Sequence, residues 1–521
     1  MDVPLPSLCP EERARVRLAW RNERTLYRRK CDATGKTIVS IFDQGTSFPV
    51  YEQQYWWSDG WDAFRFGRDV DFSRPFFSQL AGLFSAVPQC ALRCPQSENS
   101  EYTNQCEKNK DCYLIFCSNG SRECLHGMWY QQCTECIDCT YLEKSELCYE
   151  VLNGKNCYRC TFSENLRNCA ECHFSRDLIG CSNCIGCANL RNKEYYIENE
   201  RVSSNRYRER MQELGLHRHA AVEKLRLESG RFTEAQPWKF YCGKNNEESN
   251  GDYLEYNRRV VDSFNCRNSE NLFHCRDAWS GRNSLDLTET LLQDFCIALE
   301  GCYHNVGCGF SGKISETHDT WYCSHCFNSK DLFGCVGLKH HQFCILNKQY
   351  SRDEYQTLRG KLVQYMKHTE EWGQYIPASY SPFGYDESVA YEYFPLSKEE
   401  VLAQGLRWKE RETVDEPRPQ PALPESIFDA GDEILEQTLV CASSGRSYRL
   451  QKTELLVYRK LGVPLPRLHP DVRHAARMVH RNPRKLRAGN CELCRAPFET
   501  CFPPESEKVI LCEDCYNQTA V

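Results

Sequence analysis

Four cysteines near the end of the chain have the spacing of a metal site. They form the pairs Cys491-x2-Cys494 and Cys512-x2-Cys515, and the segment between the pairs is long enough to form a hairpin. Each pair can close a short turn, so that two turns place four thiolates tetrahedrally around one Zn2+, and residues 507–511 are expected to form the strand that enters the second turn. The alternative is a core of four reduced cysteines, which a module of this size hardly supports without a metal. We therefore predict Zn2+ as the cofactor at these four residues.

Two groups of cysteines in the middle of the chain are further candidate metal sites. We weigh metal binding there against the stacking of reduced thiols, and against disulfide rungs in an oxidising compartment. A thiol enzyme is another alternative, because Cys302 is near His304 in sequence and Cys326 follows His325. No phosphate-binding, metalloprotease, serine-hydrolase or dinucleotide-binding motif accompanies them, so we favour a protein that is not an enzyme. The two groups are Cys169, Cys172, Cys181 and Cys184, and Cys323, Cys326, Cys335 and Cys344.

Most other cysteines belong to a repeat with a period of 12. A helix repeats near 3.6 residues and a strand at 2, whereas short coils stacked on one another explain a period of 12. Cysteine would then serve mainly as a small inward hydrophobe. Residues 169–181 match residues 323–335, so the repeat occurs in two related arrays. The unbroken series in the first array is Cys112, Cys124, Cys136, Cys148, Cys160, Cys172 and Cys184, and Cys117 is one cysteine that leaves the underlying grid of three.

The two ends of the chain are copies of each other at an offset of 460 positions. Residues 4–6 align with residues 464–466, and Cys31 aligns with Cys491. Thr34, Glu52 and Tyr55 stand where the other three zinc ligands would be, and hydroxyl groups are poor zinc ligands. We therefore expect the N-terminal copy to have lost its metal and to be held by its many aromatic side chains instead.

Arginines recur ahead of both ribbons at the spacing of one helical face. In a chain of net charge -7, such basic stripes are suited to contact the phosphates of a nucleic acid, because arginine presents forked donors to oxygen. The alternative is that the arginines pair with acidic residues of the same fold or face water. The candidate nucleic-acid-binding residues are Arg13, Arg17, Arg21, Arg24 and Arg28 in one copy, and Arg473, Arg477, Arg481 and Arg484 in the other.

Length and composition place these features in a multidomain protein. The chain has 521 residues, 35 of them cysteine, and no apolar run long enough to span a membrane, so we expect no membrane partner and a cytoplasmic location. The predicted fold class is mainly β with accessory helices: two short-coil cysteine-rich β-solenoid-like arrays between duplicated helix and zinc-ribbon modules. The predicted units are 1–57 (degenerate ribbon), 58–99 (aromatic connector), 100–200 (array I), 201–240 (helical connector), 241–350 (array II), 351–375 (capping helix), 376–425 (aromatic and Pro-rich connector) and 426–521 (helix and zinc ribbon).

Several short motifs resemble those of a known group of proteins. They include Trp56-Trp57-Ser58-Asp59, Asp71-Phe72-Ser73-Arg74-Pro75, Ser381-Pro382-Phe383-Gly384-Tyr385 and the final ribbon. The chain is similar over nearly its whole length to uncharacterised cysteine-rich repeat proteins with terminal zinc ribbons, common in candidate-phyla bacteria. The resemblance implies architecture more than activity, and it implies a complete N-terminal ribbon from which this chain departs. We thus expect a zinc-binding scaffold that contacts nucleic acid, with a protein partner as the alternative.

Overall fold

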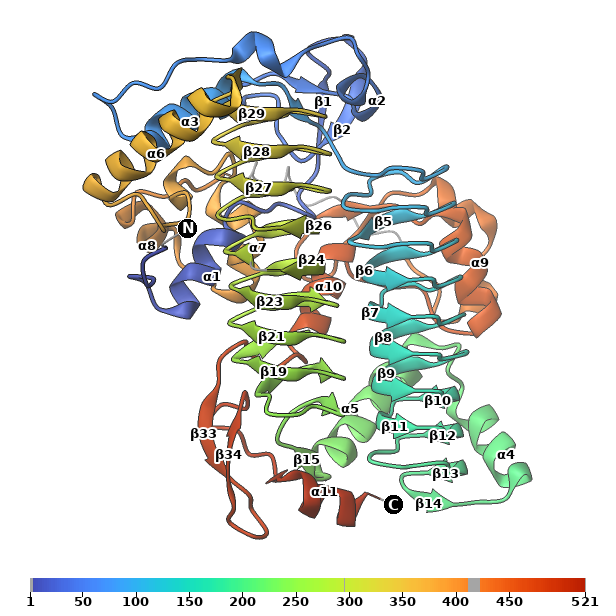
Figure 1. The fold of residues 1–521 in the computed structure, drawn as a ribbon. Helices are drawn as coiled ribbons and strands as arrows, with labels where there is room; N and C mark the ends of the chain where they lie inside the picture. The colour runs from blue at the N-terminus through green and yellow to red at the C-terminus, as the bar shows by residue number, and fades with distance from the viewer. Residues whose placement is uncertain (1–2, 295, 411–421, 521) are drawn as a thin grey trace.

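The computed structural model describes residues 3–294, 296–410 and 422–520, in which more residues lie in strands than in helices. Residues 411–421 of the predicted 376–425 connector lie outside the described residues. Figure 1 shows two long stacks of strands side by side, with helices along their outer sides and at their ends. We refer to residues 98–201 as array I and to residues 243–349 as array II.

Array I is a parallel sheet in which each coil pairs with the next coil along the chain. Ala170 pairs with Ser182 and Cys172 with Cys184, which is the predicted period, and the whole sheet has 10 strands. Only the last pair, β13 with β14, is antiparallel. The strands are β5 (Tyr113–Phe116), β6 (Leu125–Gln131), β7 (Thr140–Glu143), β8 (Tyr149–Lys155), β9 (Thr161–Arg167), β10 (Ala170–His173), β11 (Arg176–Ile179), β12 (Ser182–Ile185), β13 (Glu194–Ile197) and β14 (Glu200–Arg201).

Array II repeats this arrangement in sheets of 9 and 4 strands, with a further short pair, β16 and β18. Leu332 pairs with Cys344, so the period is the same as in array I. The strands are β16 (Gly243–Lys244), β17 (Gly251–Asp252), β18 (Leu254–Glu255), β19 (Arg258–Val261), β20 (Ser263–Phe264), β21 (Glu270–Phe273), β22 (Arg276–Trp279), β23 (Arg282–Leu285), β24 (Thr288–Asp294), β25 (Cys296–Ile297), β26 (Glu300–Val306), β27 (His318–Trp321), β28 (Lys330–Phe333), β29 (Gln342–Ile345) and β30 (Lys348–Gln349).

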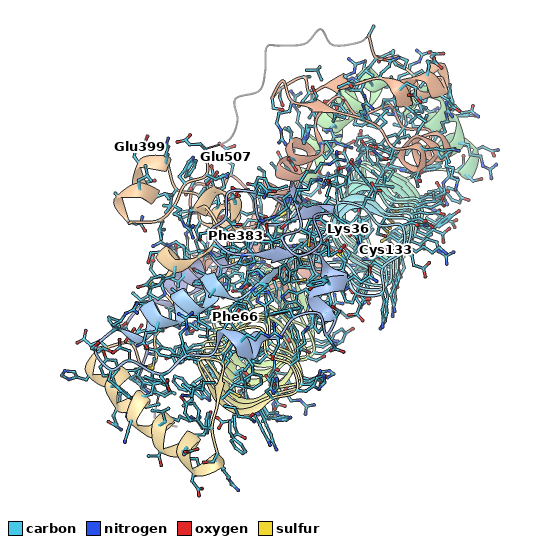
Figure 2. All side chains as sticks on the ribbon, turned by 90° about the horizontal axis from the view of Figure 1, so that it is seen from above. Lys36, Phe66, Cys133, Phe383, Glu399 and Glu507 are labelled. Carbon is cyan, nitrogen blue, oxygen red and sulfur yellow. The ribbon has the colours of Figure 1, made fainter. Side chains whose placement is uncertain are left out.

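The cysteine grid of every third position arises from the backbone. Along both arrays, residues with φ near +50° recur at every third position, and each such left-handed residue turns the chain through a corner. The residue after a corner points into the coil, and this is where the cysteines of the grid lie. Cys117, which leaves the grid, is itself a corner residue with φ of 52°. Figure 2 looks at the two arrays from above and shows the coils of each array lying over one another.

The inward cysteines also satisfy backbone carbonyl groups. The thiol of Cys169 donates to the carbonyl oxygens of Arg167 (3.2 Å) and Leu178 (3.3 Å), and this pairing with one carbonyl before and one after the thiol recurs along array I. Serine fills equivalent places, since the hydroxyl of Ser118 donates to Phe116 and accepts from the backbone of Tyr130 in the next coil. Burial raises the pKa of Cys136, and it raises the pKa of Cys275 to about 12. Cysteine is therefore both a small core residue and a hydrogen-bond donor.

One glycine of array II occupies a position that no other residue fits. Gly251 has φ of 140°, and a Cβ atom there would lie 1.8 Å from the carbonyl oxygen of Ser263 in the next coil. We expect Gly251→Ala to destabilise the protein by about 1–3 kcal/mol or more, measured by chemical denaturation, because the strained backbone and the clash act together. The matched control is Gly230→Ala in helix α5 (His219–Ala235), where nothing lies within 4 Å of the added Cβ and alanine stabilises a helix by about 1 kcal/mol relative to glycine. Equal effects of the two changes would contradict this account.

Helices and the two ribbon copies cover the ends and sides of the arrays. Capping boxes at Ser351 and Ser397 start helices α6 (Arg352–His368) and α8 (Lys398–Ala403), and helix α4 (Ser204–Leu214) after array I ends at Gly215. The remaining elements before array II are α1 (Pro10–Leu18), β1 (Tyr27–Lys30), β2 (Thr37–Ser40), β3 (Val50–Tyr51), α2 (Gln53–Trp57), the 3-10 helix η1 (Ala63–Phe66), α3 (Phe76–Ala86), β4 (Gln89–Cys90), α4 (Ser204–Leu214), α5 (His219–Ala235) and β15 (Trp238–Lys239).

After array II the chain returns along both stacks. Helix α9 lies beside array I, and α10 lies behind the region where the arrays meet (Figure 1). These elements are α6 (Arg352–His368), η2 (Ala378–Tyr380), η3 (Tyr385–Glu387), α7 (Val389–Tyr393), α8 (Lys398–Ala403), η4 (Ile427–Asp429), η5 (Asp432–Glu436), β31 (Leu439–Val440), β32 (Ser447–Tyr448), α9 (Lys452–Leu461), α10 (Pro470–Met478), β33 (Arg487–Asn490), β34 (Pro497–Thr500), β35 (Ile510–Leu511) and α11 (Glu513–Thr519).

The duplication of the two ends holds element by element. Strands β1, β2 and β3 and helix α2 each begin 460 positions before β33, β34, β35 and α11, respectively. Large aromatic side chains are buried in the N-terminal copy and just after it, among them Trp56 and Phe76. Among the described residues, none of the helices combines the length and the hydrophobicity needed to cross a membrane.

Candidate metal centre

The four C-terminal cysteines are carried by two backbone turns of the same kind. The first turn joins β33 to β34: the N–H of Cys491 donates to the carbonyl of Ala496, and the N–H of Arg495 donates back to Cys491, both at 2.9 Å. The second turn follows β35, where Cys512 precedes the first residue of α11 and Cys515 lies in its first turn. Because the N–H of Glu492 donates to Ile510 at 3.0 Å, the two turns are held side by side.

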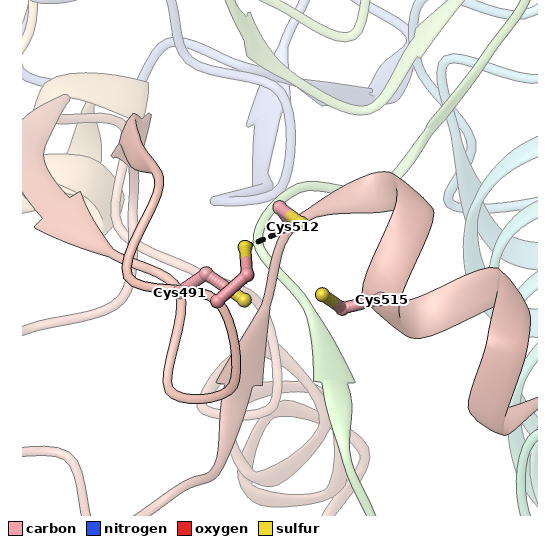
Figure 3. Close-up of side chains that lie close together, drawn as sticks. Cys491, Cys512 and Cys515 are labelled. Atoms are coloured by element: carbon pink, nitrogen blue, oxygen red, sulfur yellow. Dashed lines mark hydrogen bonds between the residues drawn. The ribbon is translucent and has the colours of Figure 1, made fainter.

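The four Sγ atoms converge on one point. They all lie within 4.8 Å of one another, and the Sγ atoms of Cys494 and Cys512 are 3.6 Å apart. Four thiolates around a tetrahedral Zn2+ would be about 3.8 Å apart, since the Zn–S distance is about 2.3 Å. Figure 3 shows Cys491 on one loop facing Cys512 and Cys515 at the start of the helix. Cys491 and Cys515 are buried and Cys494 is exposed, so a metal ion would lie at the edge of the small ribbon core.

Backbone N–H groups of the two turns favour ionised sulfur. Burial alone would raise the pKa of Cys491, but the N–H groups of Cys494, Cys512 and Leu493 outweigh it and lower the pKa to about 6. The neighbouring thiol of Cys512 raises the pKa of Cys515 to about 12, because adjacent sulfurs cannot all ionise without a cation among them. A metal ion removes that conflict. The set of four cysteines leaves no open coordination position, which is the arrangement of a structural site and not of a catalytic one.

The N-terminal copy keeps the turn but not the ligands. Cys31 is buried, and its Sγ accepts the N–H of Glu52 at 3.3 Å. Glu52 forms an ion pair with Lys36 at 3.0 Å, and the hydroxyl of Tyr55 donates to the carbonyl of Gly60. Among the described residues, the only group of three or more His, Cys, Asp or Glu side chains close enough to share a metal ion is the C-terminal one.

The two candidate metal sites in the arrays do not assemble. Their cysteines lie at successive levels of a stack, as Cys172 and Cys184 show by pairing in register. Their thiols donate to backbone carbonyls: Cys181 to Leu190 at 3.5 Å, and Cys335 to Cys344 at 3.4 Å. The groups Cys169, Cys172, Cys181 and Cys184 and Cys323, Cys326, Cys335 and Cys344 are thus not among the described side chains that lie close enough to share a metal ion, because a period of 12 stacks them in line.

Of the two cysteines with histidine neighbours in sequence, Cys326 and its neighbour His325 bond to other groups. The thiol of Cys326 donates to the carbonyl groups of Ser324 and Cys335, both at 3.5 Å. His325 is a corner residue with φ of 54°, and its Nδ1 contacts the Ser324 hydroxyl at 2.9 Å. The side chain of Cys302 lies outside the described residues.

The arginines of the N-terminal copy are engaged inside the fold. Helix α1 ends at Leu18, so the predicted helical face stops before Arg21. Arg17 and Arg21 are buried, and Arg28 alone among the five is exposed. Their partners are Asp286 for Arg13 (3.2 Å) and Arg17 (3.5 Å), Glu23 for Arg21, Asp471 for Arg24 (3.3 Å) and the Tyr102 hydroxyl for Arg28 (2.9 Å).

The arginines of the C-terminal copy are held in the same way. Helix α10 ends at Met478, and Arg473, Arg477 and Arg484 are buried. The buried arginines of both copies therefore face acidic residues of the same chain, as in the alternative to nucleic-acid binding, and nucleic-acid binding by the stripes stays a prediction. The partners are Asp138 for Arg473 and Arg477 (2.9 Å for the latter), Asp277 for Arg484 (2.9 Å), and the rings of Tyr141 and Tyr253, each 3.9 Å from the guanidinium of Arg481.

A third turn of the ribbon type forms at Cys441, where the sequence offers half of a cysteine pair and too few partners for a metal site. The N–H of Cys441 donates to Arg446 at 2.9 Å, and that of Gly445 donates to Cys441 at 3.0 Å, as at Cys31 and Cys491. Burial opposes ionisation, but the N–H of His469 and the hydroxyls of Ser443 and Ser444 lower the pKa of Cys441 to about 6. The sequence signal was the Cys441-x2-Ser444-Gly445 spacing. In the metal centre, a second turn faces the first. The segment that takes this place opposite the Cys441 turn lies just before α10, and the sequence spacing does not predict its position.

No protein family model and no curated protein matches the chain.

Proposed function

We propose that this protein is a zinc-stapled scaffold without enzymatic activity, built from two β-solenoids that the C-terminal ribbon holds in a fixed relative position. The observation that carries the proposal is the convergence of Cys491, Cys494, Cys512 and Cys515. Zn2+ is the metal we propose, since four thiolates at tetrahedral spacing are its usual structural site. When bound, the ion supplies cohesion to a ribbon that is too small for a sufficient hydrophobic core.

The ribbon contacts both arrays, which supports a role as a staple. Helix α11 reaches array I, because the hydroxyl of Tyr516 donates to Asn189 at 2.9 Å and also to Asp177. The segment before β33 reaches array II, where Asn482 donates to Asp252 at 2.8 Å. Strand β35 pairs in parallel with β15, the strand that joins the two arrays. A metal that orders the ribbon thereby orders the junction of the arrays.

We further propose that the partner of this scaffold is another protein. The arginines predicted to bind nucleic acid are mostly buried, and the chain carries a net charge of -7, which disfavours a polyanion. The two arrays offer long outward faces of regularly spaced side chains, the kind of extended surface that repeat proteins use to bind partners.

Metal analysis tests the proposal directly. Protein purified without added zinc and measured by elemental analysis is expected to contain about one zinc per chain, as four thiolates bind one ion. Copper or iron in place of zinc would contradict the metal assignment. Three or more zinc ions per chain would show that array cysteines also bind metal. The absence of any bound metal would contradict the proposal that zinc holds the ribbon together.

A further inference from the structure

A cavity of about 350 Å3 lies where array I, array II and the C-terminal ribbon meet; we call it the inter-array cavity. Eight aromatic side chains line it, among them Trp129, Trp238, Tyr241 and Trp279. Its volume lies in the range of about 300–1,000 Å3 that is typical of small-molecule sites. The neighbouring elements are tied to one another across it, since Trp129 of array I contacts Trp279 of array II with 5.6 Å between ring centres.

The wall of the inter-array cavity carries more positive than negative charge. Seven Lys or Arg side chains line it against four Asp or Glu, an excess of three positive charges. Glu143 and Glu255 are shared among three of the cations: Glu143 contacts Lys155 at 3.1 Å and also Arg267, while Glu255 contacts Arg267 at 3.2 Å and also Arg167. One charge of this group therefore stays uncompensated.

Two other wall cations neutralise the two remaining carboxylates. Arg191 pairs with Asp177 at 3.0 Å, and Lys239 pairs with Glu513. The rest of the positive excess belongs to Arg176 and Lys244, for which the structure shows no carboxylate partner among the described residues.

Arg176 is a buried cation without a counter-charge. Its side chain is 4% exposed, and its Nη2 donates only to carbonyl groups: Thr233 at 3.0 Å, Gln236 at 3.3 Å and Pro237 at 3.2 Å. Its Nε has no hydrogen-bond partner, and the guanidinium lies 3.7 Å from the centre of the Trp238 ring. A buried charge that lacks an opposite charge is costly, and a bound anion would offset that cost.

Lys244 brings a second cation to the cavity. It is exposed and lines the cavity, and its ammonium lies 5.8 Å from the centre of the Tyr256 ring. Arg176 and Lys244 are thus two cations of the cavity wall that have no carboxylate partner among the described residues.

We propose that the inter-array cavity binds a mononucleotide, with its base against the aromatic wall and its phosphates toward Arg176 and Lys244. The positive excess selects an anion, and guanidinium and ammonium groups are the usual phosphate donors in proteins. The rings select a flat partner, because every base has a face that stacks on an aromatic side chain. This site goes beyond the scaffold role proposed above, but it needs an ordered ribbon, because Phe502 and Tyr516 of the ribbon line it.

The test measures binding of three probes to the full-length, metal-loaded protein by calorimetry and by tryptophan fluorescence. The probes are ADP, adenosine and pyrophosphate. We expect ADP to bind about tenfold or more tightly than either fragment, since the base and the phosphates each contribute. Equal affinities of ADP and pyrophosphate would reduce the cavity to a plain anion site and overturn the proposal, as would the absence of ADP binding at millimolar concentration.

Two variants and a matched control locate the site. Lys244→Glu reverses an exposed charge and is expected to weaken ADP binding about tenfold or more while leaving adenosine unaffected. Lys224→Glu, at an exposed lysine of α5 outside the cavity, is expected to bind ADP as the unaltered protein does. Arg176→Gln keeps an amide donor for the carbonyl groups and removes the charge, so it should also weaken ADP binding. Unchanged ADP affinity in both cavity variants would overturn the proposal. Zinc content is measured on the same samples, so that failure of the nucleotide site can be distinguished from failure of the zinc-binding scaffold.

Discussion

Cys494→Ser is expected to abolish stoichiometric zinc binding and to unfold the C-terminal ribbon. Structural zinc contributes an apparent ~10–16 kcal/mol to the folding of small peptides at neutral pH, so loss of one of four ligands removes most of the ribbon's stability. The effect should be seen as lost zinc in elemental analysis and as a lower thermal midpoint. Fluorescence of Trp238 should change as well, because its strand pairs with β35 and its ring contacts Phe502 of the ribbon.

The control for this variant is Cys9→Ser, the same change at another exposed cysteine that lies outside the metal centre. It should retain one zinc and the original midpoint. Metal binding should also weaken as the pH falls, because protons compete with the metal for the thiolates, including that of Cys491, whose pKa is lowered to about 6. Zinc retained at full occupancy in Cys494→Ser would show that the ion is held elsewhere.

Arg473→Met is expected to destabilise the protein by about 3–5 kcal/mol, because it leaves the buried carboxylates of Asp138 and Glu454 with less positive charge to neutralise them. Both carboxylates are fully buried, and Arg473 pairs with Asp138 and lies 3.6 Å from Glu454. Arg477 remains 2.9 Å from Asp138, so the site keeps part of its compensation. Chemical denaturation measures the loss.

The same substitution at an exposed ion pair provides the comparison. Arg206 on α4 pairs with Glu213 at 3.0 Å in water, so Arg206→Met should cost about 0–1 kcal/mol. The double variant Arg473→Met with Asp138→Asn should lose less than the two single changes added together, because each removes the other's partner. If Arg473→Met kept full stability and instead lost salt-sensitive binding to RNA or DNA, the nucleic-acid hypothesis would replace the structural one.

The metal centre could be predicted from residue types and spacing because a ribbon is a local structure. Cys491 and Cys515 are close along the chain, and each turn is set by hydrogen bonds across a few residues. The period of the cysteines likewise predicted the register of 12 that pairs Cys172 with Cys184, because a repeated corner conformation is a local property of the backbone.

The fate of the arginines could not be predicted in this way. Their spacing suggested one continuous helical face, but Pro10–Leu18 is the whole of that helix, and Arg473 finds its partner at Asp138, which is 335 positions away. Whether a basic side chain meets a phosphate or a carboxylate of its own chain depends on which surfaces pack together. The array cysteines with metal-site spacing illustrate the same point, since pairing in register places them at separate levels of a stack.

The amino-acid order alone determined the metal ligands, the duplication of the ends and the pitch of the arrays, because each depends on contacts between neighbours or on a repeat along one strand direction. The burial of the arginines and the cavity lined by Arg176 and Lys244 were decided by three-dimensional packing. They arise where segments far apart in the sequence meet. The burial and the net charge at such a place depend on all the segments that pack together there, so that one segment alone does not predict them.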